Sequence, residues 1–392
     1  MWDGVRDSDI LLEKAREISR RIKGNYSDRE YPSEDMEVLR AERFNGLWIP
    51  REYGGWGIPL RLLNRVFLEL ARANASTAQV LQVHTTHSHV VARLGSAEQK
   101  TRFFRKVLEE GVWISVGGNE PGAHVADWKT KLTRVPGGYR LNGLKHFCTG
   151  HPGAYYMAAW AIPEGAPSLR EGVVMCMVPL NQEGVTIHHD WNALGQRETG
   201  SGSVSFQEVF VPDDDVIGEP GAALKPPALT GLYFQSAFTA IYIGIAEAAF
   251  EAALDYIRTE TRPWPWAGVE RAADDLYIQH HLGVLRARID AATLLLDAAS
   301  AALEAAAEGR GARAEASVAT GEAKFLATEA ALQMTNALFQ VCGARSTYTK
   351  FGFDRFWRDA RTLTLTDPID HKLREIGKYY LLKEDPPVTF YS

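Results

Sequence analysis

Apolar residues recur three and four positions apart through much of the first 112 residues, and this spacing predicts amphipathic helices. The pattern covers residues 10–18, 36–44, 60–73 and 76–94. Gly95 ends the fourth stretch, and Ser96 with Gln99 three positions later predicts a capped start for another helix. We therefore expect a helical N-terminal domain over residues 1–112.

A different period governs residues 113–224. β-Branched and aromatic residues alternate with polar ones, and turn-forming residues separate the segments at the spacing typical of all-β folds. The clearest segments are 129–134, 173–179, 185–189 and 204–212. The pattern predicts an antiparallel sheet or small barrel as a middle domain.

Helical spacing returns over residues 225–392. Four long segments cover residues 240–260, 274–308, 312–343 and 370–382. Helices of this length joined by short loops predict an antiparallel four-helix bundle, and their alanine-rich faces indicate close packing, including packing between subunits. Residues 384–392 contain two prolines and predict an extended tail. The expected fold is mainly α with a central β domain.

Composition excludes several classes of protein. The 392-residue chain is 45% hydrophobic and 23% charged, with a net charge of −6 and no basic cluster, which argues against a nucleic-acid partner. No apolar run reaches the roughly 18–20 residues of a membrane span, and the first residues lack a signal-peptide pattern. The three cysteines, Cys148, Cys176 and Cys342, are too widely spaced for a disulfide framework or a zinc motif. We expect a cytoplasmic protein without a membrane partner.

Two short stretches carry the candidate chemistry. In residues 145–150, which follow a predicted strand, a period of two places Phe147 and Thr149 on the same face. Residues 190–202 set Trp191 ahead of a turn rich in Arg, Thr and Ser. Together they predict a pocket with an aromatic wall and fixed donors, as a flavin ring requires. On these residues alone, Thr149 as an ordinary strand residue and Trp191 as a core residue remain alternatives.

Other cofactor sites are not expected. Residues 200–205 contain the first two glycines of a dinucleotide-binding motif but lack the third and precede a strand, so a Rossmann site is excluded. His84, His87 and His89 form the densest histidine group. No further ligands are grouped with them, and we expect no metal site.

Several stretches, in this order along the chain, resemble the acyl-CoA dehydrogenase superfamily. They are residues 119–122, 145–150, 190–202, 261–264, 340–346, 354–361, 367–368 and 390–392. The resemblance is strongest to the flavin-dependent monooxygenase branch, which includes the dibenzothiophene and dimethylsulfone monooxygenases. It implies N-terminal helices, a middle antiparallel β-barrel, a C-terminal four-helix bundle and a homotetramer.

The resemblance also implies roles for individual residues. Thr149 would lie near N5 of the flavin, Asn119 at its pyrimidine edge, and Phe147 and Trp191 against the ring. His84 would exchange protons near the flavin or substrate, a role suited to its near-neutral pKa. Arg262 and Arg345 would hold the phosphate, one of them from a neighbouring subunit. Outside this resemblance, His84 would be a helix histidine in a polar contact, Asn119 a turn residue, and Arg262 a helix C-terminal residue stabilised by the helix dipole.

The implied activity is that of a two-component monooxygenase. Reduced FMN from a separate reductase would react with O₂ to form a C4a-hydroperoxide, and oxygen would pass to a small hydrophobic substrate containing sulfur, nitrogen or an aromatic ring. One alternative is an FAD-dependent acyl-CoA dehydrogenase, with Asp367 in the place of the catalytic glutamate. Another is a flavin-free binding protein that retains the fold.

Two positions depart from the patterns of relatives. Asp367 is one methylene shorter than the dehydrogenase base and precedes Pro368, so it is interpreted as structural. Leu363 and Thr366 stand where sulfur-oxidising relatives have histidines. The absence of these two histidines argues against a proton relay of the dibenzothiophene monooxygenase type, but it does not argue against flavin binding.

Overall fold

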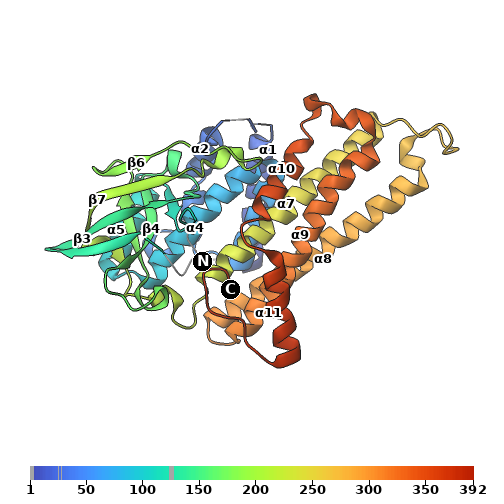
Figure 1. The fold of residues 1–392 in the computed structure, drawn as a ribbon. Coiled ribbons are helices and arrows are strands. Elements are labelled where there is room, and N and C mark those ends of the chain that lie inside the picture. Colours follow the sequence, from blue (N-terminus) through green and yellow to red (C-terminus); the bar gives the residue numbers. More distant parts are fainter. Residues whose placement is uncertain (1–3, 25, 28, 123–127) are drawn as a thin grey trace.

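The structure is a computed structural model that describes residues 4–24, 26–27, 29–122 and 128–392. Helices come first, a sheet follows, and a second set of helices completes the chain (Figure 1). The predicted class, mainly α with a central β domain, is confirmed.

Five helices precede the sheet. They are α1 (Gly4–Ile22), α2 (Ser33–Ala41), α3 (Leu60–Ala73), α4 (Ala75–Leu94) and α5 (Ala97–Glu109). The Asn74 side chain caps α4 by accepting from the backbone N–H groups of Ser76 and Thr77. The capping box predicted at Ser96 and Gln99 is present at the start of α5.

Helix α4 is buried on almost every side. It packs against α3, α7 and β1, between the sheet and the bundle (Figure 1). Its buried residues include polar ones, among them Gln79, Gln82 and His87. Buried polar groups need partners, so this helix is where the first domain brings hydrogen-bonding side chains to the interior.

The central strands form one eight-stranded sheet. The strands are β1 (Ile114–Gly117), β2 (Lys131–Val135), β3 (Gly138–Lys145), β4 (Tyr156–Pro163), β5 (Val174–Pro179), β6 (Val185–Ile187), β7 (Val204–Pro212) and β8 (Val216–Ile217), with the short helix α6 (Leu169–Gly172) between β4 and β5. The order is β6-β7-β3-β2-β4-β5-β8, and β1 also pairs with β4. Most neighbouring strands are antiparallel, as expected, but β1 and β2 run parallel to β4, so the sheet is mixed. Alternation within a strand predicts a sheet face but not the direction of the neighbouring strand.

The C-terminal helices are α7 (Thr230–Thr259), α8 (Leu276–Ala307), α9 (Arg313–Cys342), α10 (Asp354–Leu363) and α11 (Ile369–Leu382). Helix α7 begins ten residues before the predicted start at 240. The prediction placed the start too late because buried polar residues in the first turns interrupt the apolar pattern. It is also the one described helix whose length and hydropathy suit a membrane span. However, 72% of its most apolar stretch is buried in the bundle, as in the core helix of a globular domain.

Beyond α11 the chain returns as an extended tail, and the C-terminus lies near the middle of the molecule (Figure 1). The carbonyl oxygens of Ser392 and Tyr391 accept hydrogen bonds from Arg313 and Lys372 respectively. Ser392 is almost fully buried. The tail is therefore a fixed part of the fold.

Candidate active site

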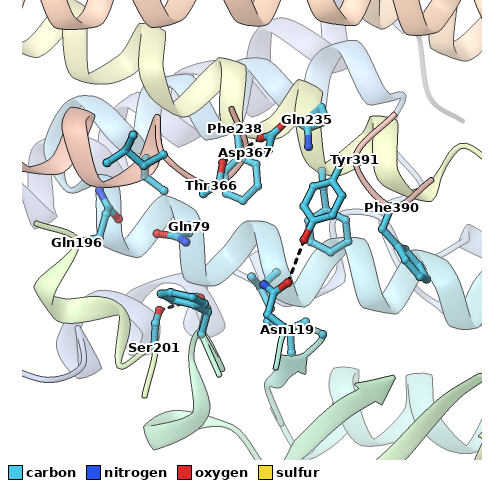
Figure 2. Close-up of a pocket in the computed structure, with 18 of the residues that line it drawn as sticks. Gln79, Asn119, Gln196, Ser201, Gln235, Phe238, Thr366, Asp367, Phe390 and Tyr391 are labelled. Atoms are coloured by element: carbon cyan, nitrogen blue, oxygen red, sulfur yellow. Dashed lines mark hydrogen bonds between the residues drawn. The ribbon is translucent and has the colours of Figure 1, made fainter. Parts of the chain in front are cut away.

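A cavity of about 480 Å³ lies where the sheet, α4, α7, the segment after α10 and the C-terminal tail meet. Figure 2 shows side chains from α4, α7, the segment after α10, the tail and loops of the β domain around it. Of the predicted site residues, Asn119, Phe147, Thr149 and Trp191 line this cavity, whereas His84, Arg262 and Arg345 do not.

Aromatic rings form much of the wall. Phe147 and Trp191 pack edge to face with ring centroids 6.0 Å apart. Phe390 from the tail stacks on Trp128 and meets Trp160 edge to face, with centroids 5.9 and 5.0 Å apart. A cavity with such walls suits a flat, largely apolar ring system.

Thr149 and Phe147 both line the cavity, but the backbone conformation that places them there is not the predicted strand. Strand β3 ends at Lys145, and Phe147 has a left-handed backbone (φ 55°), so strand alternation does not extend through this stretch. The Thr149 hydroxyl lies 2.8 Å from the Ser201 hydroxyl, which lies 2.7 Å from that of Thr199. Three linked hydroxyls therefore join the two stretches that the sequence singles out.

Asn119 lies at another edge of the cavity. Its Oδ1 accepts a hydrogen bond of 3.1 Å from the Tyr391 hydroxyl, as drawn in Figure 2. Its carbonyl accepts from the backbone N–H of His146 at 2.8 Å, which fixes it beside the end of β3. The amide nitrogen keeps its donor capacity for a ligand in the cavity.

Unpartnered polar atoms provide a test of whether a flavin fits. Gln79 Oε1 and both amide atoms of Gln196 are buried without a hydrogen-bond partner, and both residues line the cavity. An unpaired buried amide is costly. A ring with apolar faces and a polar edge of donors and acceptors would satisfy these amides while filling the aromatic cavity. The donor set therefore fits an isoalloxazine ring.

Hydrogen bonds from α10 fix the loop that carries Trp191 and Gln196. Asp359 accepts a 2.6 Å hydrogen bond from the Gln196 backbone N–H, and the Thr362 hydroxyl accepts one of 2.9 Å from Gly195. Within the loop, the Trp191 indole N–H donates to the Gln196 carbonyl at 2.9 Å. Burial raises the pKa of Asp359 to about 6, despite the opposing hydrogen bond from Gln196.

His84 does not occupy the role implied for it. The ring is fully buried, its Nδ1 accepts from the Ile114 backbone N–H at 3.1 Å, and its Nε2 donates to the Asn45 carbonyl at 2.8 Å. Burial lowers the pKa of His84 to about 4. With both nitrogens engaged away from the cavity, His84 connects the short 3-10 helix η1 (Phe44–Gly46) and β1 to α4.

His87, one helical turn further on, is the histidine that lines the cavity. Its Nδ1 donates to the Val83 carbonyl at 2.8 Å, and its Nε2 accepts a long 3.4 Å contact from the Trp160 indole N–H. Burial lowers its pKa to about 4. His87 is therefore a neutral ring with a weakly engaged acceptor nitrogen at the cavity.

Asp367 also lines the cavity, but it is already paired. Its Oδ1 accepts from the buried Lys324 ammonium, which also donates to the Gln235 side chain. Burial lowers the pKa of Lys324, while the Asp367 carboxylate acts in the opposite direction. The second carboxylate oxygen is buried without a partner. The buried ion pair with Lys324 agrees with the structural interpretation of Asp367.

Arg262 and Arg345 lie at the other end of α7 from the cavity. Gln235 lines the cavity near the start of α7, and Arg262 follows the end of that helix at Thr259. At about 1.5 Å per residue, this separation is roughly 36 Å along the helix. Arg262 is exposed, and Arg345 forms a half-exposed ion pair of 3.3 Å with Glu260. Among the described lining residues there is neither lysine nor arginine.

Comparison with known proteins identifies the family. Family models described as the N-terminal, middle and C-terminal domains of acyl-CoA dehydrogenase match residues 13–110, 116–209 and 236–366. A dibenzothiophene monooxygenase from Mycolicibacterium goodii is 36% identical over 97% of this chain and 96% of its own length. The chain belongs to the acyl-CoA dehydrogenase family.

Further similarities place it within the family. A probable FMNH2-dependent monooxygenase, SfnC, from Pseudomonas putida is 31% identical over 92% of this chain and 91% of its own. The crystal structure of FMN-bound TdsC from Paenibacillus sp. A11-2 superimposes with a TM-score of 0.92 at 33% identity, covering 97% of this chain and 99% of that one. This member of the acyl-CoA dehydrogenase family therefore lies in the flavin-dependent monooxygenase branch.

Several lining residues of the cavity are not among those predicted from the sequence, namely Gln79, His87, Gln196, Gln235 and Tyr391. Gln79, His87 and Gln235 are polar residues on the buried faces of their helices. A single polar residue in a helical sequence is normally predicted to be exposed. The one available signal was the spacing of Gln79, Val83 and His87, each four residues apart on one face of α4.

Proposed function

We propose that this protein is the oxygenase component of a two-component flavin-dependent monooxygenase that uses reduced FMN and O₂. The relatives named above support the class of reaction, and the cavity supports the cofactor. The observation that carries the proposal is the pairing of aromatic walls with the unpartnered amides of Gln79 and Gln196.

When bound, reduced FMN supplies the electrons with which O₂ is activated. The protein's part is to bind, orient and exclude water. Phe147 and Trp191 would pack against the ring, the Thr149 and Ser201 hydroxyls and the Asn119 amide would bond its edge, and the remaining aromatic wall would keep solvent away. His87 Nε2, neutral at physiological pH, would accept a proton from a group in the cavity.

The dehydrogenase alternative finds less support. Its base must be free to remove a proton from carbon, but Asp367 is paired with Lys324 and is one methylene shorter than glutamate. The substrate we propose is a small, flat, apolar molecule that shares the cavity with the flavin. Leu363 makes its wall apolar where relatives have a histidine, so proton exchange would depend on His87.

A homotetramer would complete the site. Arg262 and Arg345 lie too far from the cavity of their own chain to reach a phosphate there, which supports a role in a neighbouring subunit. Large apolar side chains are exposed on the loop before α8, on α8 and on α11, among them Trp266, Tyr277, Leu294 and Leu381. Such surfaces suit contact between subunits. We further propose a separate flavin reductase partner and a reducing cytoplasmic compartment, in which the three buried cysteines would stay as thiols.

The test combines cofactor binding with isotope labelling. The purified protein, an NADH-dependent flavin reductase and FMN would be incubated under ¹⁸O₂ with a panel of aromatic thioethers, indoles and sulfones. We expect one ¹⁸O atom in the product and a requirement for reduced FMN. Reduction of a dye by acyl-CoA thioesters, with no ¹⁸O incorporated into any compound of the panel, would instead establish the dehydrogenase.

A further inference from the structure

Three ligand-type side chains converge outside the cavity. Glu30 comes from the segment between α1 and α2, His151 from the turn after Thr149, and His189 from the segment after β6. The His189 Nδ1 lies 3.0 and 3.1 Å from the two Glu30 carboxylate oxygens, and the His151 Nε2 lies 4.0 Å from the nearer one. One ligand atom from each residue lies within 4.8 Å of the other two.

His151 is the residue that points to a ligand. It is 1% exposed, and its Nε2 has no hydrogen-bond partner although it is buried. Its Nδ1 lies 3.1 Å from the Cys148 carbonyl, which can only accept, so the proton is on Nδ1 and Nε2 carries a free lone pair. Metal-binding histidines are held in this way, by a carbonyl or carboxylate on the other ring nitrogen.

The three residues are positioned by the backbone around them. A Cβ at Gly202 would lie 3.2 Å from His151 Cε1, and one at Gly200 would lie 3.1 Å from the Glu30 carbonyl, so both glycines permit close approach. Asp190 accepts from the backbone and the hydroxyl of Ser203, which fixes the residue after His189. His189 itself has a left-handed backbone (φ 48°).

The chemistry of the set selects the kind of ion. Two imidazole nitrogens and a carboxylate suit Zn²⁺ and similar transition metals, whereas Mg²⁺ and Ca²⁺ prefer oxygen ligands. Zinc–ligand bonds of about 2.0–2.2 Å place tetrahedral ligand atoms roughly 3.3 Å apart. The His189 Nδ1 lies slightly closer than that to the two Glu30 oxygens, at 3.0 and 3.1 Å. Glu30 and His189 are both solvent-exposed and can close the remaining gap to His151.

We propose that Glu30, His151 and His189 form a site for a divalent transition-metal ion, with Zn²⁺ as the preferred ion and water completing its coordination. The ion would join the segment before α2 to two segments of the β domain. His151 is two residues from Thr149, and His189 is two residues from Trp191, so the ion would fix the backbone beside both cavity residues without touching the cavity itself.

The experiment is a calorimetric titration of the full-length, chelator-treated protein with Zn²⁺ alone. All samples would carry His280→Ala and His281→Ala, which remove a pair of adjacent histidines on α8, one exposed and one half-buried, as a competing surface site. We expect one Zn²⁺ per chain, tetrahedral absorption bands with Co²⁺, and a higher melting temperature with metal.

Variants of the exposed ligands keep the test independent of folding. Glu30→Gln and His189→Ala should each weaken Zn²⁺ binding by on the order of 100-fold, since even partners of ligands cost about 10–100-fold. The matched control is His188→Ala, which removes an exposed neighbouring histidine bonded to Ser205 and should bind as the parent does. Three results would overturn the proposal. They are a parent that binds no stoichiometric Zn²⁺, Glu30→Gln and His189→Ala variants that bind Zn²⁺ as tightly as the parent, and a His188→Ala variant that loses as much Zn²⁺ affinity as those two.

Discussion

The two histidines on adjacent turns of α4 have different surroundings, although the sequence presents them alike. Both ring nitrogens of His84 form hydrogen bonds with backbone groups, whereas one ring nitrogen of His87 faces the cavity. Which histidine faces the cavity depends on how α4 is rotated against the sheet. A single sequence does not contain that rotation.

Glutamine substitutions separate these functions. His84→Gln should lower the free energy of unfolding by about 1–3 kcal/mol, because buried backbone groups of Asn45 and Ile114 lose their partner. His87→Gln should leave stability close to that of the parent and reduce turnover roughly tenfold or more, with a changed pH–rate profile. Denaturant unfolding and steady-state oxygenation assays measure both. Loss of turnover only in folded His84→Gln would reverse the assignment.

Asp359 predicts a pH dependence of stability. Its folded pKa of about 6 lies above the unfolded value of about 3.9, so the native state holds the proton more tightly. Its contribution to stability is therefore present below about pH 4 and is lost as the pH rises through 6, at a cost of about 2–3 kcal/mol.

Asp359→Asn should remove that loss, because the neutral amide oxygen still accepts from Gln196. Relative to the parent, the variant should gain stability between pH 4 and pH 7, as measured by urea unfolding at each pH. A difference between variant and parent that stays constant over this range would contradict the assignment.

At the scale of elements, the C-terminal tail contributes two lining residues of the cavity, Phe390 and Tyr391. Phe390 fills the space between Trp128 and Trp160, and the Tyr391 hydroxyl bonds Asn119. A composition of Pro, Thr, Phe, Tyr and Ser predicts only an extended segment. The contacts that fix this tail come from Arg313 on α9, which is distant in sequence, and from Lys372 on the preceding helix α11.

Removing residues 390–392 should open the cavity to solvent while leaving the helices of the bundle intact. We expect more hydrogen peroxide per NADH oxidised and less oxygenated product, because water gains access to the reacting groups. Tyr391→Phe is the milder comparison, since it keeps the packing and loses one hydrogen bond. Unchanged coupling of NADH oxidation to product in the truncated protein would show that the tail does not exclude water.

The elements themselves were largely predictable. Period and capping residues predicted α3, α4, α5 and most of the bundle, because each buries a continuous apolar stripe. Strand direction, the start of α7 and the existence of α10 were not predicted. Those features depend on partners outside the segment, such as β4 for the parallel strands and the loop at Gln196 for α10.

At the scale of the whole molecule, the phosphate site tests the proposed assembly. Arg345→Ala should weaken binding of reduced FMN by roughly 10–100-fold with little change in melting temperature, because a charge-assisted contact is lost at an exposed position. Arg258→Ala, at the same end of α7 and also exposed, is the matched control. Anaerobic fluorescence titration measures both. Equal FMN affinity in Arg345→Ala and the parent would remove Arg345 from the site.

The residues of the cavity were identified in part because local motifs carry them. Asn119, Phe147, Thr149 and Trp191 lie in short stretches that resemble the family, and all four line the cavity. Glu30 lies more than a hundred residues before His151 and His189 in sequence, and the three residues share no motif. Only the folded chain brings them together.

The length of α7 has a consequence for assemblies that contain two different inactive variants. Each chain carries its cavity near one end of this helix and its two phosphate-binding candidates beyond the other. In the proposed tetramer, a chain with a damaged cavity can still lend intact arginines to a neighbour, and a chain without those arginines can still offer an intact cavity. Mixed assemblies of two inactive variants, one altered at Thr149 and the other at Arg345, should thus recover part of the lost turnover by complementation.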